Sequence, residues 1–260
     1  MDIHADRFNN INEFLNTCDS RDYNEWARHR RDEYDNKSWQ GDSYSAARDY
    51  LLHGDNRYTN QLKPRTLPQV TDIKPRDYNA VVGYSPIVPA AVMNIPTCMI
   101  NRQNTTAKNK VLHIVYDCDA SCDVNKRQMI EQGKKVAAFI LSVERAGYRV
   151  QLDVFASFQQ RGDDNGYAFT LTLKDAARPL DIKRLTYPLI HISMLRALAF
   201  DWFERYPHAD YVCGYGLPLY HESKEYRDDF VHKVTHDNTA TYITLTTDID
   251  RLYEELTARQ

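Results

Sequence analysis

Strand-like and helix-like segments alternate from residue 110 to the end of the chain, and this alternation constrains the fold more than any other feature. VLHIVYD at 111–117 is short, apolar and rich in β-branched residues, which is typical of a buried strand. An apolar stripe over 125–146, closed by Gly147, predicts an amphipathic helix. The same reasoning predicts strands at 149–158, 167–175, 210–216 and 239–246, and helices at 187–206 and 248–256. Short connections between such elements predict a layered α/β fold with a mainly parallel central sheet.

The first 107 residues have a different character and predict two further regions. Helical patterns at 8–18, 24–34 and 43–54, the last closed by Gly54, predict a helical N-terminal region over residues 1–55. Residues 56–107 lose this periodicity and contain Pro64, Pro68, Pro75, Pro86, Pro89 and Pro96. We expect an extended, proline-rich, basic connector there, followed by the α/β domain over 108–260.

Composition places the chain among soluble globular proteins. It is 42% apolar and 27% charged. Its longest apolar runs fall short of the roughly 20 residues that cross a bilayer, and its N-terminus lacks a signal-peptide core. Five cysteines without zinc-ribbon spacing predict free thiols in a reducing compartment. We therefore expect a cytoplasmic protein without a membrane partner.

Positive charge is concentrated between residues 56 and 116, which hold eight basic and two acidic residues, a net charge of +6. Tyrosines interleave with these cations, a pattern that suits single-stranded nucleic acid. The candidate nucleic-acid-binding residues are Arg57, Tyr58, Lys63, Arg65, Lys74, Arg76, Arg102, Lys108 and Lys110. The alternative is that the connector packs its tyrosines against the domain and leaves its lysines in solvent.

The stretch HIVYDCDASCDV ends a predicted strand with Asp117, Asp119 and Ser121. Together with the helix at 125–146, the strands QLDVFASF and AFTLTL, and Thr186 ahead of the helix at 187–206, it resembles a von Willebrand factor A-type domain over about 108–258. The resemblance implies a vWA-like three-layer fold and a site for Mg²⁺, Mn²⁺ or Ca²⁺.

The implied metal ligands are Asp117, Asp119, Ser121 and Thr186. Asp119 stands where the family motif has a serine, and Gly214 and Tyr215 stand where its third acidic residue is expected, so the site is degenerate. The alternative is that the carboxylates cap the following helix or pair with basic groups.

The overall layout also resembles an uncharacterised group of bacteriophage-encoded proteins. The two resemblances together imply a non-enzymatic adaptor in the host cytoplasm that binds another protein. A sharper hypothesis adds single-stranded DNA binding through the basic segment and recruitment of a replication or transcription protein.

Two other function classes stay open. The same Asp-x-Asp resembles haloacid-dehalogenase-like phosphotransferases, with Asp117 as nucleophile, Asp119 as general acid, Mg²⁺ as cofactor, Ser157 at the second phosphate position and Lys183 as a candidate lysine. A virion or host-interaction protein is the third class. His232 and His236 have helical spacing but lack the glutamate of a zinc protease, so we interpret them as polar surface.

Overall fold

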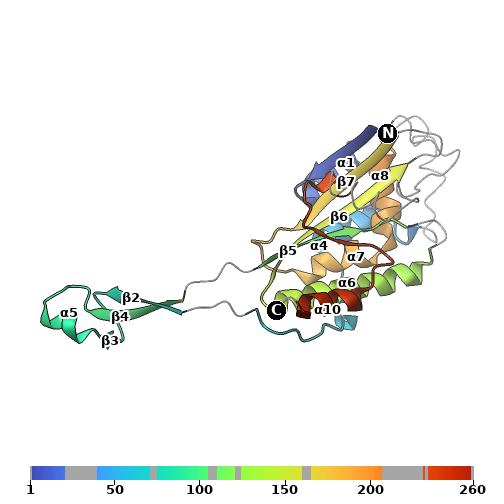
Figure 1. The fold of residues 1–260 in the computed structure, drawn as a ribbon. Coiled ribbons are helices and arrows are strands. Elements are labelled where there is room, and N and C mark those ends of the chain that lie inside the picture. The colour runs from blue at the N-terminus through green and yellow to red at the C-terminus, as the bar shows by residue number, and fades with distance from the viewer. Residues whose placement is uncertain are drawn as a thin grey trace.

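The computed structural model describes residues 2–20, 40–70, 75–104, 110–120, 124–159, 165–206, 231 and 234–258. A five-stranded sheet with the order β1-β7-β6-β5-β8 forms the centre of the body (Figure 1). Its strands are β1 (Asp2–Phe8), β5 (Val111–Asp117), β6 (Arg149–Gln159), β7 (Asn165–Lys174) and β8 (Thr241–Ile243). β5 pairs in parallel with β6 and β8, β1 pairs in parallel with β7, and only the β6–β7 pair is antiparallel. The predicted mixed α/β fold with a mainly parallel sheet is confirmed.

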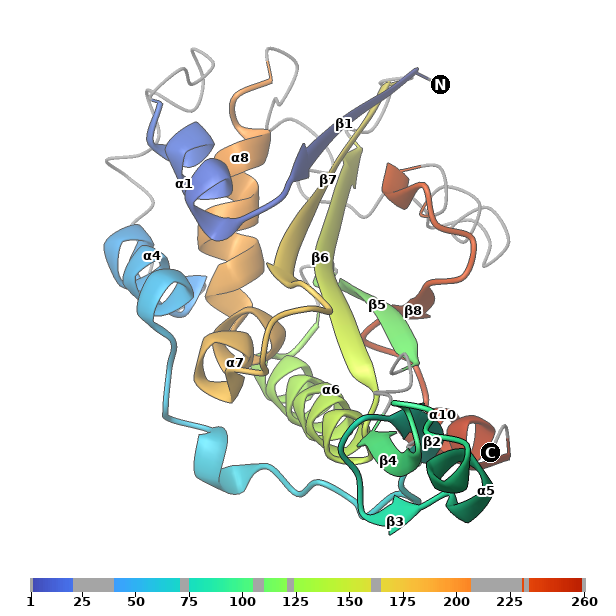
Figure 2. The same ribbon diagram turned by 90° about the vertical axis from the view of Figure 1, so that its left-hand side faces the viewer.

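One face of the sheet packs against a layer of helices. Ile114 and Tyr116 of β5 and Leu152 and Val154 of β6 occupy alternate positions of their strands and lie in the main hydrophobic core. The long helix α6 (Lys126–Arg145) covers this face, and a capping box between Asn125 and Gln128 fixes its start. Figure 2 shows α1, α4, α6, α7 and α8 on this side of the sheet.

The helix α7 (Ile182–Ile190) crosses α6 at Gly133. A Cβ atom at Gly133 would collide with the backbone of Leu189 and Ile190, so this close approach requires glycine. α7 begins five residues before the predicted helix at 187–206, because Asp181 caps its first turn with hydrogen bonds to the N–H groups of Lys183 and Arg184. The helix α7 ends at Ile190, with His191 as its C-cap. The chain then continues as a π-helix, η2 (Met194–Ala199), and as α8 (Phe200–Phe203).

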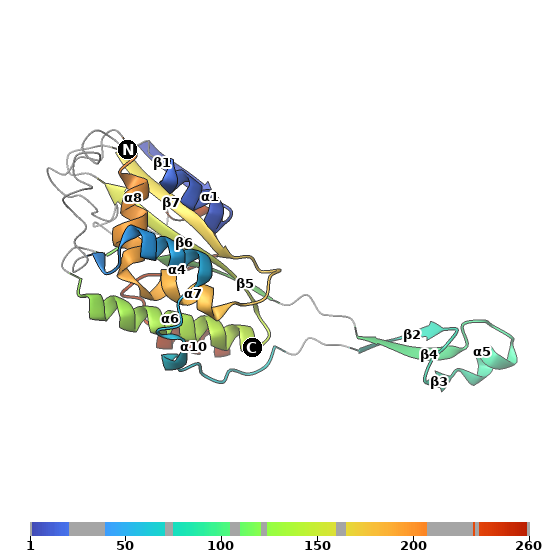
Figure 3. The ribbon, with the colours of Figure 1, turned by 180° about the vertical axis from the view of Figure 1, so that it is seen from behind.

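The N-terminal region is part of the body. α1 (Ile11–Asp19) and α4 (Tyr44–His53) confirm two of the predicted helices, and Gly54 ends α4 with a φ of 85°. Residues 2–8 form β1, however, where we predicted only helices, and β1 extends the sheet beyond β7 (Figure 3). Phe14 and Leu51 lie in the same core as the central strands, so the region is not a separate appendage. The predicted helix at 24–34 lies outside the described residues, as does the predicted strand at 210–216.

The opposite face of the sheet carries a smaller apolar cluster. Val115, Phe155 and Ala168 project there and contact Val231 and Val234. The C-terminal helix α10 (Ile249–Ala258) packs instead against α6, where Tyr253 stacks edge-on against Phe139. Among the described residues, no helix combines the length and the apolar composition needed to cross a bilayer.

The described part of residues 56–107 does not form the single extended connector that we predicted. It forms two different structures. Residues 56–70 run along the body and include one short 3-10 helix, η1 (Thr59–Gln61). Residues 75–104, which we call the arm, contain β2 (Pro75–Ala80), β3 (Ser85–Pro86), α5 (Val88–Val92) and β4 (Met99–Asn104). The three strands form their own sheet in the order β2-β4-β3, and the arm projects away from the body (Figures 1 and 3).

Candidate functional site

The arm carries eight of the nine exposed large hydrophobic side chains of the described residues. Within a chain that is 27% charged, residues 78–101 contain no Asp, Glu, Lys, Arg or His. Val82 is 75% exposed, Val92 78% and Met93 66%. The other large exposed side chains of the arm are Tyr78, Val81, Tyr84, Val88 and Ile95, and Val111 is the single such residue among those described outside it.

The arm has no core of its own. None of residues 78–102 is buried, so the turns and strands are held mainly by backbone hydrogen bonds. Tyr84 N–H donates to the carbonyl of Ile100 at 2.9 Å and Ile87 N–H to that of Cys98 at 2.7 Å. Gly83 lies so close to β4 that a Cβ atom would overlap the carbonyl of Ile100. A small sheet without a buried face is only marginally stable in water. The exposed apolar side chains of the arm therefore form a surface that is suited to contact with a partner.

The base of the arm combines aromatic and cationic groups. The guanidinium of Arg102 lies 5.4 Å from the centre of the Tyr84 ring, and both side chains are exposed. Arg76 lies in β2 opposite Gln103 of β4, and exposed Lys110 immediately precedes β5. These three cations are the part of the predicted nucleic-acid-binding set that the structure brings to the arm and its base.

The remaining members of that set are distributed over the body or undescribed. Arg65 forms an ion pair with Asp250 and stacks over the Tyr253 ring at 4.6 Å. Lys63 is exposed on the segment that runs along the body, whereas Lys74 and Lys108 lie outside the described residues. The structure therefore divides the predicted strip between two separate regions.

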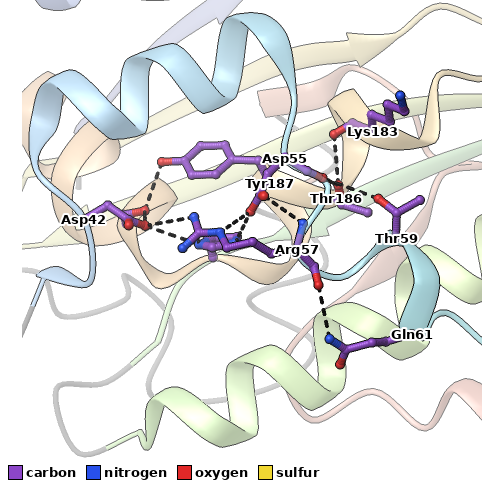
Figure 4. Close-up of polar contacts among 10 residues, drawn as sticks. Asp42, Asp55, Arg57, Thr59, Gln61, Lys183, Thr186 and Tyr187 are labelled. Carbon is purple, nitrogen blue, oxygen red and sulfur yellow. Dashed lines mark hydrogen bonds and ion pairs between the residues drawn. The ribbon is translucent and has the colours of Figure 1, made fainter.

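Arg57 belongs to a polar network between the 42–61 segment and α7 (Figure 4), and the ring of Tyr58 packs beside this network. Arg57 Nε donates to Asp55 Oδ2 at 2.8 Å, and its guanidinium lies 3.6 Å from Asp42. The ring of His191 is held between the same two carboxylates, with Nε2 at 2.7 Å from Asp55 and Nδ1 at 3.3 Å from Asp42. Tyr58 lies 5.3 Å from the His191 ring.

The electrostatics of this network favour a structural role. Burial raises the pKa of Asp55, but the hydrogen bonds from Arg57 outweigh burial and hold that pKa below its usual value. Burial and the Arg57 charge together lower the pKa of His191 and outweigh the opposite effect of its two carboxylate neighbours. The hydroxyl of Ser193 donates a hydrogen bond to Asp42 Oδ2 at 3.1 Å. The Asp42 carboxylate is therefore also part of the network. The network fastens the N-terminal segment to α7.

Thr186, a predicted metal ligand, is also part of this network. Its hydroxyl lies 2.7 Å from the carbonyl oxygen of Asp55 and 2.9 Å from that of Lys183, and its side chain is 1% exposed. Figure 4 shows Thr186 of α7 beside Lys183 of the same helix and beside Asp55 of the N-terminal segment. It lies inside a helix, where we had expected a loop.

The predicted acidic strand end is present, and its carboxylates are engaged by neighbouring protein groups. Asp119 Oδ2 accepts from the backbone N–H of Ser157 at 2.7 Å and from its hydroxyl at 2.9 Å. Asp117 accepts the backbone N–H of Asp119 at 2.8 Å and the hydroxyl of Tyr242. Asp117 and Asp119 thus lie together, as both the A-type and the phosphotransferase interpretations require, and Ser157 lies beside Asp119, as the phosphotransferase interpretation requires.

Two of the predicted metal ligands have hydrogen-bond partners within the protein. Thr186 directs its hydroxyl to Asp55, Asp119 directs an oxygen to Ser157, and Ser121 lies outside the described residues. Within the described part of the chain, no group of three or more His, Cys, Asp or Glu side chains is placed to hold a metal ion. Lys183 lies in the first turn of α7, where its carbonyl accepts the N–H of Asp55.

Sequence reasoning missed a second charged cluster, on the sheet face opposite α6. His113 Nε2 lies 2.8 Å from Asp153 of β6, and Nδ1 contacts Asp237 ahead of β8. Burial lowers the pKa of His113, but the hydrogen bonds to the two carboxylates outweigh it and raise that pKa above its usual value. The available signal was a histidine and an aspartate inside two adjacent apolar strands.

Comparison with known families gives a match that covers nearly the whole chain. A family model described as a domain of unknown function, DUF7192, matches residues 3–257. Neither the curated proteins nor the solved structures give a significant match.

Proposed function

The chain belongs to this DUF7192 family, and we propose that it is a non-enzymatic binding protein, an adaptor whose arm is the binding element and whose α/β body carries that arm. The observation that supports this proposal is the exposed, uncharged arm. Eight large apolar or aromatic side chains between residues 78 and 95 are each 41–78% exposed. Side chains exposed to this degree make a surface on the order of 1,000 Å², above the roughly 300–600 Å² of the largest apolar patch on a typical monomer.

An A-type body is part of the proposal. β5, β6 and β8 are parallel neighbours, and β7 runs antiparallel beside β6, which agrees with the strand directions that the resemblance implies. β1 adds a further strand beyond β7, which the resemblance does not include. Phage origin stays a prediction from the resemblance in layout, and recruitment of a replication or transcription protein stays a hypothesis from the basic segment and its tyrosines.

Catalysis by Asp117 is less favoured than binding. A nucleophilic carboxylate must reach phosphorus, whereas Asp117 accepts two hydrogen bonds from its own chain. We expect no Mg²⁺-dependent hydrolysis of p-nitrophenyl phosphate. Turnover that disappears in Asp117→Asn would establish the phosphotransferase alternative instead.

Single-stranded DNA is a second candidate ligand, favoured by the stacked pair of Arg102 and Tyr84 in the arm and by exposed Lys110 ahead of β5. Exposed aromatic rings beside cations suit unpaired bases and phosphates. In a mobility-shift assay with an oligothymidylate at about 50 mM salt, the double variant Arg102→Ala, Lys110→Ala should weaken binding. Lys63→Ala, on the body, is the matched control and should leave binding unchanged.

Hydrogen exchange tests whether the arm is a binding element. Amides of residues 78–101 are followed in the complete chain, alone and mixed with an oligothymidylate, with neutral lipid vesicles or with excess unlabelled chain. The proposal expects protection of the arm in at least one mixture, because a bound partner covers its exposed backbone. Unchanged exchange in every mixture contradicts it.

A further inference from the structure

The arm has an exposed apolar surface, and the chemistry of that surface indicates which partner covers it. We infer that two copies of this chain associate through their arms, so that the partner covering residues 78–101 of one copy is the same segment of the other. This inference rests on the proposed function and names the partner for the arm.

The distribution of exposed apolar side chains over the described residues supports a second copy of the chain as the partner of the arm. Outside the arm, Val111 is the only exposed large hydrophobic residue among those described, so the described body offers few exposed apolar side chains to receive the arm. Among the described residues, the group of exposed apolar side chains that could cover Val82, Val92 and Met93 is therefore that of another arm. Contact of one patch with itself is the geometry of a two-fold dimer, the commonest assembly of identical chains.

Charge supports the same arrangement. Each copy carries a net charge of −3, and charged residues occur throughout the body, yet residues 78–101 have none. Residues 78–101 of two arms can therefore approach without bringing like charges of this segment together. A nucleic acid would find no cationic side chain for its phosphates in the same segment.

The available area is sufficient for a stable dimer. The eight exposed side chains of the arm amount to on the order of 1,000 Å² per copy, against the roughly 800 Å² that each partner contributes to a standard interface. Covering them would also give the arm the buried core that it lacks alone.

Backbone structure favours protein over lipid as the covering surface. Residues 81–84 and 93–98 lie outside helices and strands. Irregular backbone has N–H and C=O groups that water or protein can pair, whereas hydrocarbon leaves them unsatisfied. A vesicle is accordingly an outcome of the test and not the partner that we infer.

Sedimentation velocity of the complete chain provides the test, over about 1–100 µM. Wild type should form a dimer. The double variant Val82→Asp, Val92→Asp should raise the dimer dissociation constant at least about 100-fold, because it buries two carboxylates in an apolar interface. Val111→Asp is the matched control: it places the same charge on a valine that is 60% exposed outside the arm, and it should remain dimeric. Unaltered thermal unfolding of the double variant excludes misfolding.

Three results overturn the inference: a monomeric wild type at the highest concentration, a dimer that both arm substitutions leave intact, or a dimer that Val111→Asp disrupts equally. The proposed function fails separately. A monomer whose arm is protected from hydrogen exchange by vesicles or by an oligothymidylate overturns the inference and keeps the arm as a binding element. A monomer whose arm is unprotected in every mixture overturns both.

Discussion

Ser157 donates two hydrogen bonds to one oxygen of Asp119, from its backbone N–H at 2.7 Å and from its hydroxyl at 2.9 Å. Asp119 follows β5 and Ser157 lies in β6, so the pair joins the loop after the central strand to the neighbouring strand. Ser157 is fully buried and Asp119 is 8% exposed. The acidic motif at Asp117 and Asp119, which suggested a metal or phosphate site, therefore holds the loop after β5 against β6.

Removing this acceptor should destabilise the body. Asp119→Ala leaves the N–H and hydroxyl of Ser157 buried without that carboxylate, and we expect a loss of about 1–3 kcal/mol in the free energy of unfolding. Urea denaturation measures it. Glu131→Ala removes an exposed carboxylate paired with Lys134 and should change stability by less than about 0.5 kcal/mol. Equal effects of the two substitutions would show that Asp119 has no fastening role.

Divalent cations should leave the protein's unfolding temperature unchanged. Asp117 and Asp119 are engaged by protein donors, and the Thr186 hydroxyl is directed to Asp55. A ligand that binds only the folded state must raise the unfolding temperature. We expect a change below about 1 °C with about 5 mM Mg²⁺ or Mn²⁺. A larger rise that Asp117→Asn abolishes would restore the metal-site interpretation.

His113 should make stability fall as pH rises above neutrality. An unfolded histidine has a pKa of about 6.5, and the pKa of folded His113 is raised by Asp153 and Asp237. Its stabilising charge is therefore fully present below about pH 6.5 and is lost as pH rises through the folded pKa. The pKa of Asp237 is lowered to about 2, so its own titration lies far below this range.

His113→Gln provides the comparison. The variant should be less stable than wild type by about 1.5–3 kcal/mol near pH 6, because it loses hydrogen bonds to charged groups. The difference should shrink towards pH 9. Urea denaturation at about half-unit steps of pH measures both curves. A constant difference across the range would mean that the imidazole charge contributes nothing.

Arg57 should affect stability and not nucleic-acid binding. Its guanidinium donates to Asp55, which is 5% exposed, and lies beside the His191 ring. Arg57→Ala should lower the free energy of unfolding by about 1–3 kcal/mol. Binding of an oligothymidylate by the folded variant should equal that of wild type. Weakened binding without a loss of stability would return Arg57 to the predicted DNA-binding strip.

Local sequence patterns predicted the elements whose burial is periodic. Val111–Asp117 is a continuous apolar run and Lys126–Arg145 has an apolar stripe, and both form as expected. β1 was missed because its side chains from His4 to Arg7 are exposed or half-buried and carry little apolar periodicity. Its pairing with β7 joins residues about 160 positions apart, and local patterns do not report such contacts.

The arm was predicted as a connector because of its prolines. The absence of charged residues over 78–101 was a second signal, which separates an interaction surface from a solvated loop. Thr186 was placed ahead of a helix predicted at 187–206, whereas Asp181 caps α7 and Thr186 lies inside it. The motif at 117–119 was found from sequence, but its hydrogen bonds to Ser157 and Tyr242 depend on tertiary structure.

The most direct test of the central claim is the mass in solution of the complete chain and of a chain in which residues 75–104 are replaced by a short Gly-Ser linker. Light scattering at about 50 µM gives both masses. The account predicts twice 30.4 kDa for the complete chain, and a monomer with an unchanged unfolding temperature for the armless chain. The same association state for both chains would contradict the arm as the element through which this protein binds.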